Sequence, residues 1–102
     1  SFSKMTNTMN LRELLDCLSG SLLLCVSSMN PKSMCYGLYE EKKSNVQRYW
    51  AAIKLKLKRD TDRIALIEAL MDEMFCAFGS GDKDKGVLLA MALYGAQIEK
   101  LR

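Results

Sequence analysis

Apolar residues recur at intervals of three and four positions along most of this chain, and this spacing constrains the fold more than any other feature. Residues spaced in this way share one face of a helix, whereas a half-buried strand alternates apolar and polar residues. One such face spans residues 11–29 and is preceded by Asn10, a residue suited to an N-cap, with Glu13 three positions later. We predict a helix there and keep a short strand over residues 22–26 as an alternative. The face consists of Leu11, Leu14, Leu15, Leu18, Leu22, Cys25, Val26 and Met29.

The stretch AAIKLKLKRD at residues 51–60 admits two interpretations. Its isoleucine and leucines alternate with lysines, as in a half-buried strand over residues 53–58. When the window is extended back to residue 46, five apolar residues fall within an arc of about 100° on one side of a helix. We therefore prefer a basic helix, which leaves Leu55 as an odd apolar residue on its polar side, and keep the strand as an alternative. The five residues of the arc are Val46, Tyr49, Trp50, Ile53 and Leu57.

Three further segments complete the predicted helices. Asn30 followed by Pro31 predicts the start of a short helix over residues 31–41. A broad apolar stripe predicts a central helix that begins at residue 60 or 61 and ends before Gly79. The last segment, residues 82–102, carries apolar stripes on two sides, and the second stripe consists of Leu89, Leu93 and Ala96. The sequence thus predicts an all-α fold, a compact bundle or orthogonal array of four to five helices.

All of these segments lie within residues 10–102, which we predict to form a single helical domain. Residues 1–9 are predicted to be a disordered or tag-like N-terminus. The longest apolar runs are far shorter than the roughly 20 residues that a membrane span needs, so we expect no membrane association and a cytoplasmic location. The redox state of the four cysteines stays open, with reduced thiols as the simplest interpretation and disulfides as the alternative.

Catalytic and metal-binding patterns are weak throughout the chain. The sequence has no histidine, which is the commonest general base and metal ligand. The cysteines lack C-x-x-C spacing, and the loop GSGDKDKG at residues 79–86 lacks the order of a phosphate or calcium loop. The acids Glu68, Asp72 and Glu73 lie on the polar side of the central helix, where we expect a solvated or salt-bridged face. The sequence therefore predicts no enzyme, no metal site and no cofactor.

Positive charge is concentrated in residues 42–63, which hold eight Lys or Arg against two Asp, while acids exceed bases in the rest of the chain. On a helix, the side opposite the 46–57 stripe would carry bases without an acid among them. Such a face fits an acidic protein or phosphates, although solvated helix faces have the same composition. The candidate residues of this face are Lys43, Arg48, Lys54, Lys58 and Arg59.

The missing catalytic groups and the second apolar stripe of the last segment together favour a small non-enzymatic helical protein that binds another protein. Its class would be that of a regulator, inhibitor, immunity protein or chaperone. A helix that is apolar on two sides is buried on two sides, so we expect a homodimer whose candidate face is Leu89, Leu93 and Ala96. The alternative is a nucleic-acid-binding regulator that uses the basic helix face of residues 42–63.

Overall fold

The computed structural model describes the backbone of residues 2–102 and the side chains of residues 5–94 and 98–102. No residue in the described range is in a strand, which confirms the all-α prediction and excludes strands over residues 22–26 and 53–58. The elements in chain order are α1 (Phe2–Asn7), α2 (Leu11–Ser27), α3 (Tyr39–Lys56), the 3₁₀ turn η1 (Thr61–Arg63), α4 (Ile64–Gly79), α5 (Lys83–Ala92) and the π-helical turn η2 (Leu93–Ile98).

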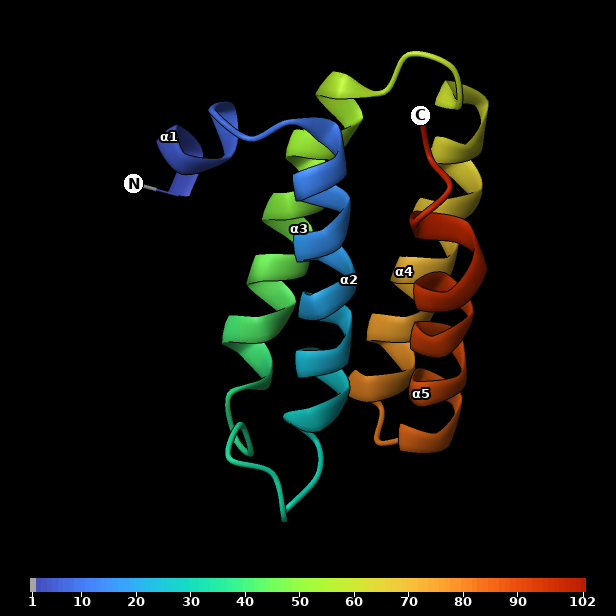
Figure 1. Ribbon diagram of the computed structural model, residues 1–102. Helices are drawn as coiled ribbons and strands as arrows, with labels where there is room; N and C mark the ends of the chain where they lie inside the picture. The colour runs from blue at the N-terminus through green and yellow to red at the C-terminus, as the bar shows by residue number, and fades with distance from the viewer. Residues whose placement is uncertain (1) are drawn as a thin grey trace.

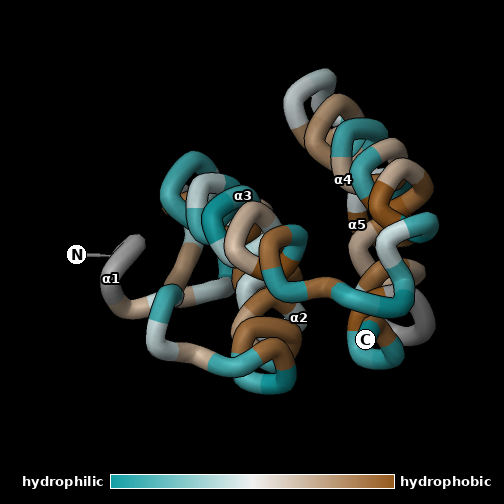
Figure 2. Tube along the Cα trace, turned by 90° about the horizontal axis from the view of Figure 1, so that it is seen from above, coloured by the Kyte–Doolittle hydropathy of each residue, from teal (hydrophilic) through white to brown (hydrophobic). Residues whose placement is uncertain are grey.

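The fold consists of two antiparallel helical hairpins, α2 with α3 and α4 with α5 (Figure 1). The hairpins lie side by side and meet where α2 contacts α5 and η2 (Figure 2). The apolar stripes converge on this junction, and each fully buried Leu or Ile contributes roughly 1.5–3 kcal/mol to folding. The fully buried apolar side chains come from α2 to the end of the chain: Leu14, Leu15, Leu18, Leu22, Cys25, Val46, Ile53, Ile67, Met74, Ala90, Leu93, Ile98 and Leu101.

The start of α2 agrees with the sequence prediction. The side chain of Asn10 accepts the backbone N–H of Glu13 at 2.9 Å, and the carboxylate of Glu13 accepts the N–H of Asn10 at 3.1 Å. This reciprocal pair satisfies two N–H groups that the first turn of a helix otherwise leaves without partners.

The connection between α2 and α3 differs from the prediction, because the separate short helix expected over residues 31–41 does not form. Residues 31–37 form turns, and α3 begins at Tyr39. Asn30 accepts the N–H of Lys32 with its side chain, as in a turn, rather than capping a helix. Gly37 has φ +89°, which a right-handed helix cannot include, and its N–H donates to the carbonyl of Ser28 at 3.2 Å. These local bonds close the hairpin in place of a helical turn.

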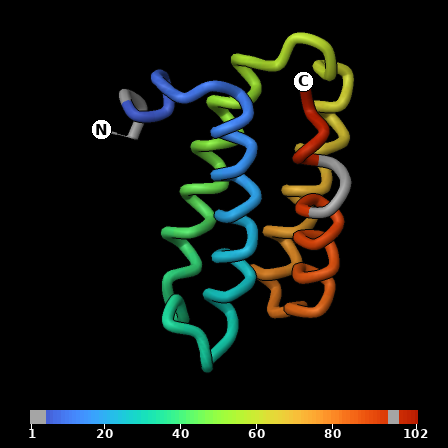
Figure 3. The backbone as a smooth tube through the Cα atoms, viewed as in Figure 1, coloured from blue at the N-terminus to red at the C-terminus, as the bar shows by residue number. Residues whose placement is uncertain are grey.

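The chain end returns to the junction of the two hairpins. Glu99, which follows η2, accepts hydrogen bonds from Arg12 at 2.7 Å and from the buried hydroxyl of Ser19 at 2.8 Å. Leu101 then inserts into the core. The last residue consequently lies at the same end of the molecule as the α3–α4 connection (Figure 3).

The domain prediction is not decided by these observations. The backbone of Phe2–Asn7 is helical and Thr6 is buried. The tag-like origin of residues 1–9 and the single domain over residues 10–102 stay predictions.

Candidate functional site

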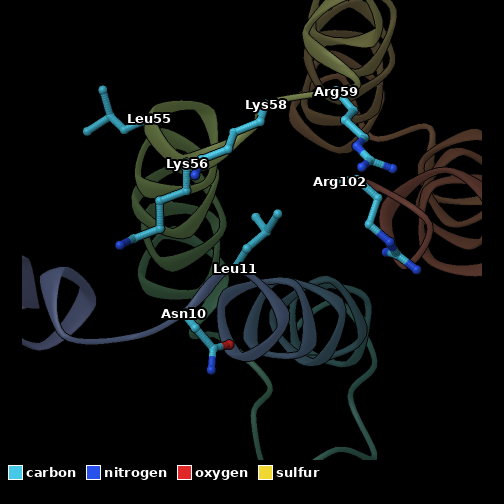
Figure 4. Close-up of a pocket in the computed structure, with 7 residues that line it drawn as sticks. All are labelled: Asn10, Leu11, Leu55, Lys56, Lys58, Arg59 and Arg102. Atoms are coloured by element: carbon cyan, nitrogen blue, oxygen red, sulfur yellow. The ribbon is translucent and has the colours of Figure 1, made fainter.

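The end of α3 and residue 102 lie beside the start of α2, and between them is an open pocket of about 550 Å³ (Figure 4). This volume lies within the range of roughly 300–1,000 Å³ that is typical of ligand sites. We call it the basic pocket, and it is lined by Asn10, Leu11, Leu55, Lys56, Lys58, Arg59 and Arg102.

Backbone hydrogen bonds assemble the basic pocket from distant segments. Helix α3 stops at Lys56 because Leu57 adopts an extended conformation and buries its side chain in the core. The next three N–H groups, at residues 58–60, donate to the carbonyl oxygen of Arg102 at 3.3, 3.0 and 3.1 Å. The carboxylate of Asp60 in turn accepts the N–H of Arg102 at 2.8 Å. Asp60 therefore holds the chain end and makes no side-chain cap to η1.

Four of the seven lining residues are basic, and a neighbouring carboxylate, that of Asp60, is bonded to the N–H of Arg102 at 2.8 Å. None of the described residues that line it is acidic. Lys56 is half-buried, whereas Lys58, Arg59 and Arg102 are exposed. Figure 4 shows Lys56 and Lys58 extending from the end of α3, with Arg59 and Arg102 on the side of the chain end. Like charges in one cleft raise the local concentration of anions and favour an acidic ligand.

Two leucines give the same pocket an apolar part. Leu55, the odd residue of the predicted helix, is 86% exposed on the last turn of α3. Leu11 is half-buried and packs against the core with its inner side. An exposed leucine next to a group of cations is a surface on which an apolar ligand group gains contact area.

The predicted basic face is divided by the structure. Lys58 and Arg59 line the basic pocket, but they follow α3 rather than belong to it. The amino group of Lys43 lies 5.3 Å from the ring centroid of Phe75, and Lys54 forms an ion pair with Glu68. Both lysines therefore turn towards α4. Arg48 is exposed on α3 and is not among the residues that line the pocket. The prediction of one continuous helix side is wrong, because α3 ends early and α4 supplies partners for two of its lysines.

Two basic residues of the pocket were missed by the sequence prediction. Lys56 lies in the basic segment, and its omission followed from assigning it to another side of the helix. Arg102 lies 42 positions from Asp60, and hydrogen bonds of its backbone to the backbone of residues 58–60 and to the carboxylate of Asp60 bring it to the site. No local pattern in the sequence could have indicated that contact.

A second, smaller pocket of about 360 Å³ lies between α3 and α4. At its edge Glu68 accepts hydrogen bonds from Nζ of Lys54 at 2.5 Å and from the indole N–H of Trp50 at 3.1 Å. These bonds, that from Lys54 first, lower the pKa of Glu68 below its ordinary value of 4.5. With the Glu73–Lys85 pair at 3.3 Å, they confirm the predicted salt-bridged face of the central helix.

Among the described residues, no three His, Cys, Asp or Glu side chains gather in a way that could hold a metal.

The predicted dimer face is not presented to solvent as expected. Leu93 is 0% exposed, and Leu89 is half-buried against the core of its own chain. The side chain of Ala96 lies outside the described residues. Leu89 and Leu93, the described part of the second apolar stripe, therefore pack against the core of their own chain, and the expectation for Leu93 is wrong. The outward side of α5 instead carries Leu88, which is 71% exposed, and Met91.

The buried cysteine of α2 serves packing. Burial raises the pKa of Cys25 to about 11, so its thiol is protonated at neutral pH and is a poor nucleophile.

Comparisons with known proteins found no match among protein-family models, curated proteins or solved structures. None of the described helices has the length and apolar character needed to cross a membrane.

Proposed function

We propose that this chain is a small non-enzymatic helical protein that acts by binding another protein, with the basic pocket as its site for an acidic partner. Its class is that of a regulator, inhibitor, immunity protein or chaperone. The observation that carries this proposal is the convergence of four cations and the exposed Leu55, with no acid among the described lining residues. Complementary charge speeds encounter with an acidic partner and excludes basic ones.

A protein partner is favoured over nucleic acid by how the cations are distributed. Nucleic acids present phosphates in a repeating row, so a binding face gains from cations spread along it. Lys43 and Lys54 would extend such a row along α3, but they contact Phe75 and Glu68. Lys56, Lys58 and Arg59 instead lie around one pocket with Arg102 and two leucines, which suits a short acidic segment of a protein.

The alternative is a nucleic-acid-binding regulator that uses residues 42–63. Lys58 and Arg59 are exposed and support this candidate as well. The two functions predict different ligands for the same positive surface.

The test compares a labelled poly-glutamate with a labelled DNA duplex, by fluorescence anisotropy over a range of salt concentrations. We expect the poly-glutamate to bind more tightly than the duplex, and Lys58→Gln combined with Arg59→Gln to weaken that binding. The matched control is Lys32→Gln with Lys83→Gln, which removes the same charge at two exposed positions away from the pocket. Preference for the duplex, with a steep loss on adding salt, would instead establish the alternative.

A homodimer remains part of the proposal, with a different contact from the predicted one. Leu88 and Met91 on the outward side of α5 supply the apolar surface that Leu93 does not. Sedimentation of the purified chain tests this, with Leu88→Glu expected to shift a dimer to the monomer. A monomer at tens of micromolar concentration contradicts the dimer and leaves the proposal for the basic pocket untouched.

The proposal also places the protein in the cytoplasm. It rests on the four cysteines, which are all free in the structure, as is usual in a reducing compartment.

A further inference from the structure

We infer that the basic pocket recognises an acidic peptide segment with a bulky apolar side chain among its carboxylates, so that leucine or phenylalanine is selected along with the charge. The inference rests on the proposed function and names the chemistry of the partner at that site. Leu55 receives the apolar side chain, and the Lys and Arg of the pocket receive the carboxylates.

The exposure of Leu55 argues for an apolar element in the ligand. Its side chain is 86% exposed, although the preceding residues of α3 that face the core are fully covered. Leu11 lines the same pocket and is itself supported by core contacts. A ligand side chain placed on Leu55 is removed from water together with that leucine, which favours binding in proportion to the apolar area covered. Free phosphate and polyphosphate have no group that gains from this contact.

The two arginines argue for carboxylates as the charged element. A guanidinium group binds a carboxylate through two parallel hydrogen bonds, which a lysine cannot do. Arg102 is already held in place, because its backbone is bonded to residues 58–60 and its side chain donates to the carbonyl of Leu101 at 2.9 Å. A pre-ordered cation loses less conformational entropy when the ligand binds.

The openness of the pocket argues for a segment of polypeptide rather than an enclosed small molecule. Five of its seven lining residues are exposed, and the other two are half-buried. A chain can therefore lie across the mouth while one side chain enters. The cations come from the end of α3, the following loop and residue 102, so they are spread along the mouth, while Leu55 points outward from α3 on the side away from Arg102 (Figure 4).

The experiment uses the full chain and two labelled peptides of equal length and net charge. Both are rich in glutamate, and they differ only in a central position occupied by leucine or by alanine. A third probe is inorganic polyphosphate, used as an unlabelled competitor. We expect the leucine peptide to bind about tenfold more tightly than the alanine peptide, which corresponds to about 1.4 kcal/mol. Polyphosphate should compete poorly at physiological salt.

Two serine variants locate the effect. Leu55→Ser should abolish the preference for leucine while leaving the affinity for the alanine peptide within about twofold, since the charges are unchanged. Leu66→Ser is the control, because it removes another exposed leucine, on α4, that lies outside the pocket. Both positions are at the surface, so circular dichroism should show that both variants fold.

Three other outcomes would contradict the inference, and they differ in what they imply for the proposed function. Equal binding of the two peptides overturns this inference and leaves the proposed function standing. Loss of the preference in Leu66→Ser rather than in Leu55→Ser places the apolar contact on α4 and also overturns it. No binding of either peptide, or displacement by polyphosphate at equal charge, overturns both the inference and the proposed function.

Discussion

Position 86 shows how one missing side chain sets the distance between two helices. A Cβ atom built on Gly86 would lie 2.5 Å from Cε1 of Phe78, too close for any real contact. Phe78 is buried on α4 and packs edge-on against Tyr39, with their ring centroids 5.8 Å apart. The ring therefore has little room to move away, and the tight packing of α5 on α4 depends on glycine.

Replacing this glycine should destabilise the fold by overpacking. We expect Gly86→Ala to lower the free energy of unfolding by about 1–3 kcal/mol in urea denaturation. Gly20→Ala is the matched control within α2, since nothing lies within 4 Å of its Cβ position. That variant should be more stable by up to about 1 kcal/mol, because alanine favours the helix. The same sign for both variants would contradict this account.

The carboxylate of Glu68 provides a test by pH. The hydrogen bonds from Lys54 and Trp50 lower the pKa of Glu68 in the folded chain below its ordinary 4.5. Its stabilising contribution is therefore present above pH 4.5 and is lost as the pH falls through the lowered pKa. Thermal midpoints of Glu68→Gln should accordingly fall less than those of the unchanged chain between about pH 7 and about pH 3. The control is Asp72→Asn, which removes an exposed carboxylate one turn further along α4. Parallel pH profiles for Glu68→Gln and the unchanged chain would refute the role of Glu68.

For single helices, the sequence predicted where apolar periodicity produces a helix, but it did not predict helix ends that depend on tertiary contacts. The stripe of residues 46–57 identified α3 because periodicity is a property of the segment itself. Its end was not predictable, because it depends on the burial of Leu57 and on backbone bonds from residues 58–60 to Arg102. The helix expected over residues 31–41 failed for a local reason, the positive φ of Gly37, which composition alone does not reveal.

The capping box of α2 is the local prediction that is most easily measured. Asn10→Ala removes the oxygen that accepts the N–H of Glu13, and we expect a loss of about 1 kcal/mol in the free energy of unfolding. Asn10→Ser keeps a capping oxygen and should retain most of the stability. If the two variants unfold at the same denaturant concentration, the cap contributes nothing.

For the whole molecule, the important contacts are those that join the two hairpins. The carboxylate of Glu99 bonds to Arg12 and Ser19 on α2, which ties the chain end to the first hairpin. The basic pocket arises from the same return of the chain, since Arg102 follows Glu99 by three residues. The sequence therefore indicated a positive segment but not a site, because the site exists only once both hairpins have docked.

Removing the Glu99 carboxylate should weaken this junction. Ser19 is buried, so Glu99→Ala leaves its hydroxyl without that acceptor, and we expect a cost of about 1–3 kcal/mol by denaturant titration. Glu41→Ala is the control, since Glu41 is exposed and pairs only with its neighbour Lys42 at 3.8 Å among the ion pairs seen in the described part of the chain. Equal stability of both variants would show that the junction is held by apolar contacts alone.

The three amide N–H groups at residues 58–60 donate to the carbonyl of Arg102, so their hydrogen exchange reports whether the basic pocket is occupied. These hydrogen bonds slow the exchange of the three amides with deuterated water, and Arg102 also lines the site that a ligand would occupy. An occupant that engages Arg102 must therefore slow exchange at these amides by the factor with which it favours the closed state. Hydrogen–deuterium exchange at residues 58–60 can accordingly rank candidate partners on the unlabelled, unaltered chain.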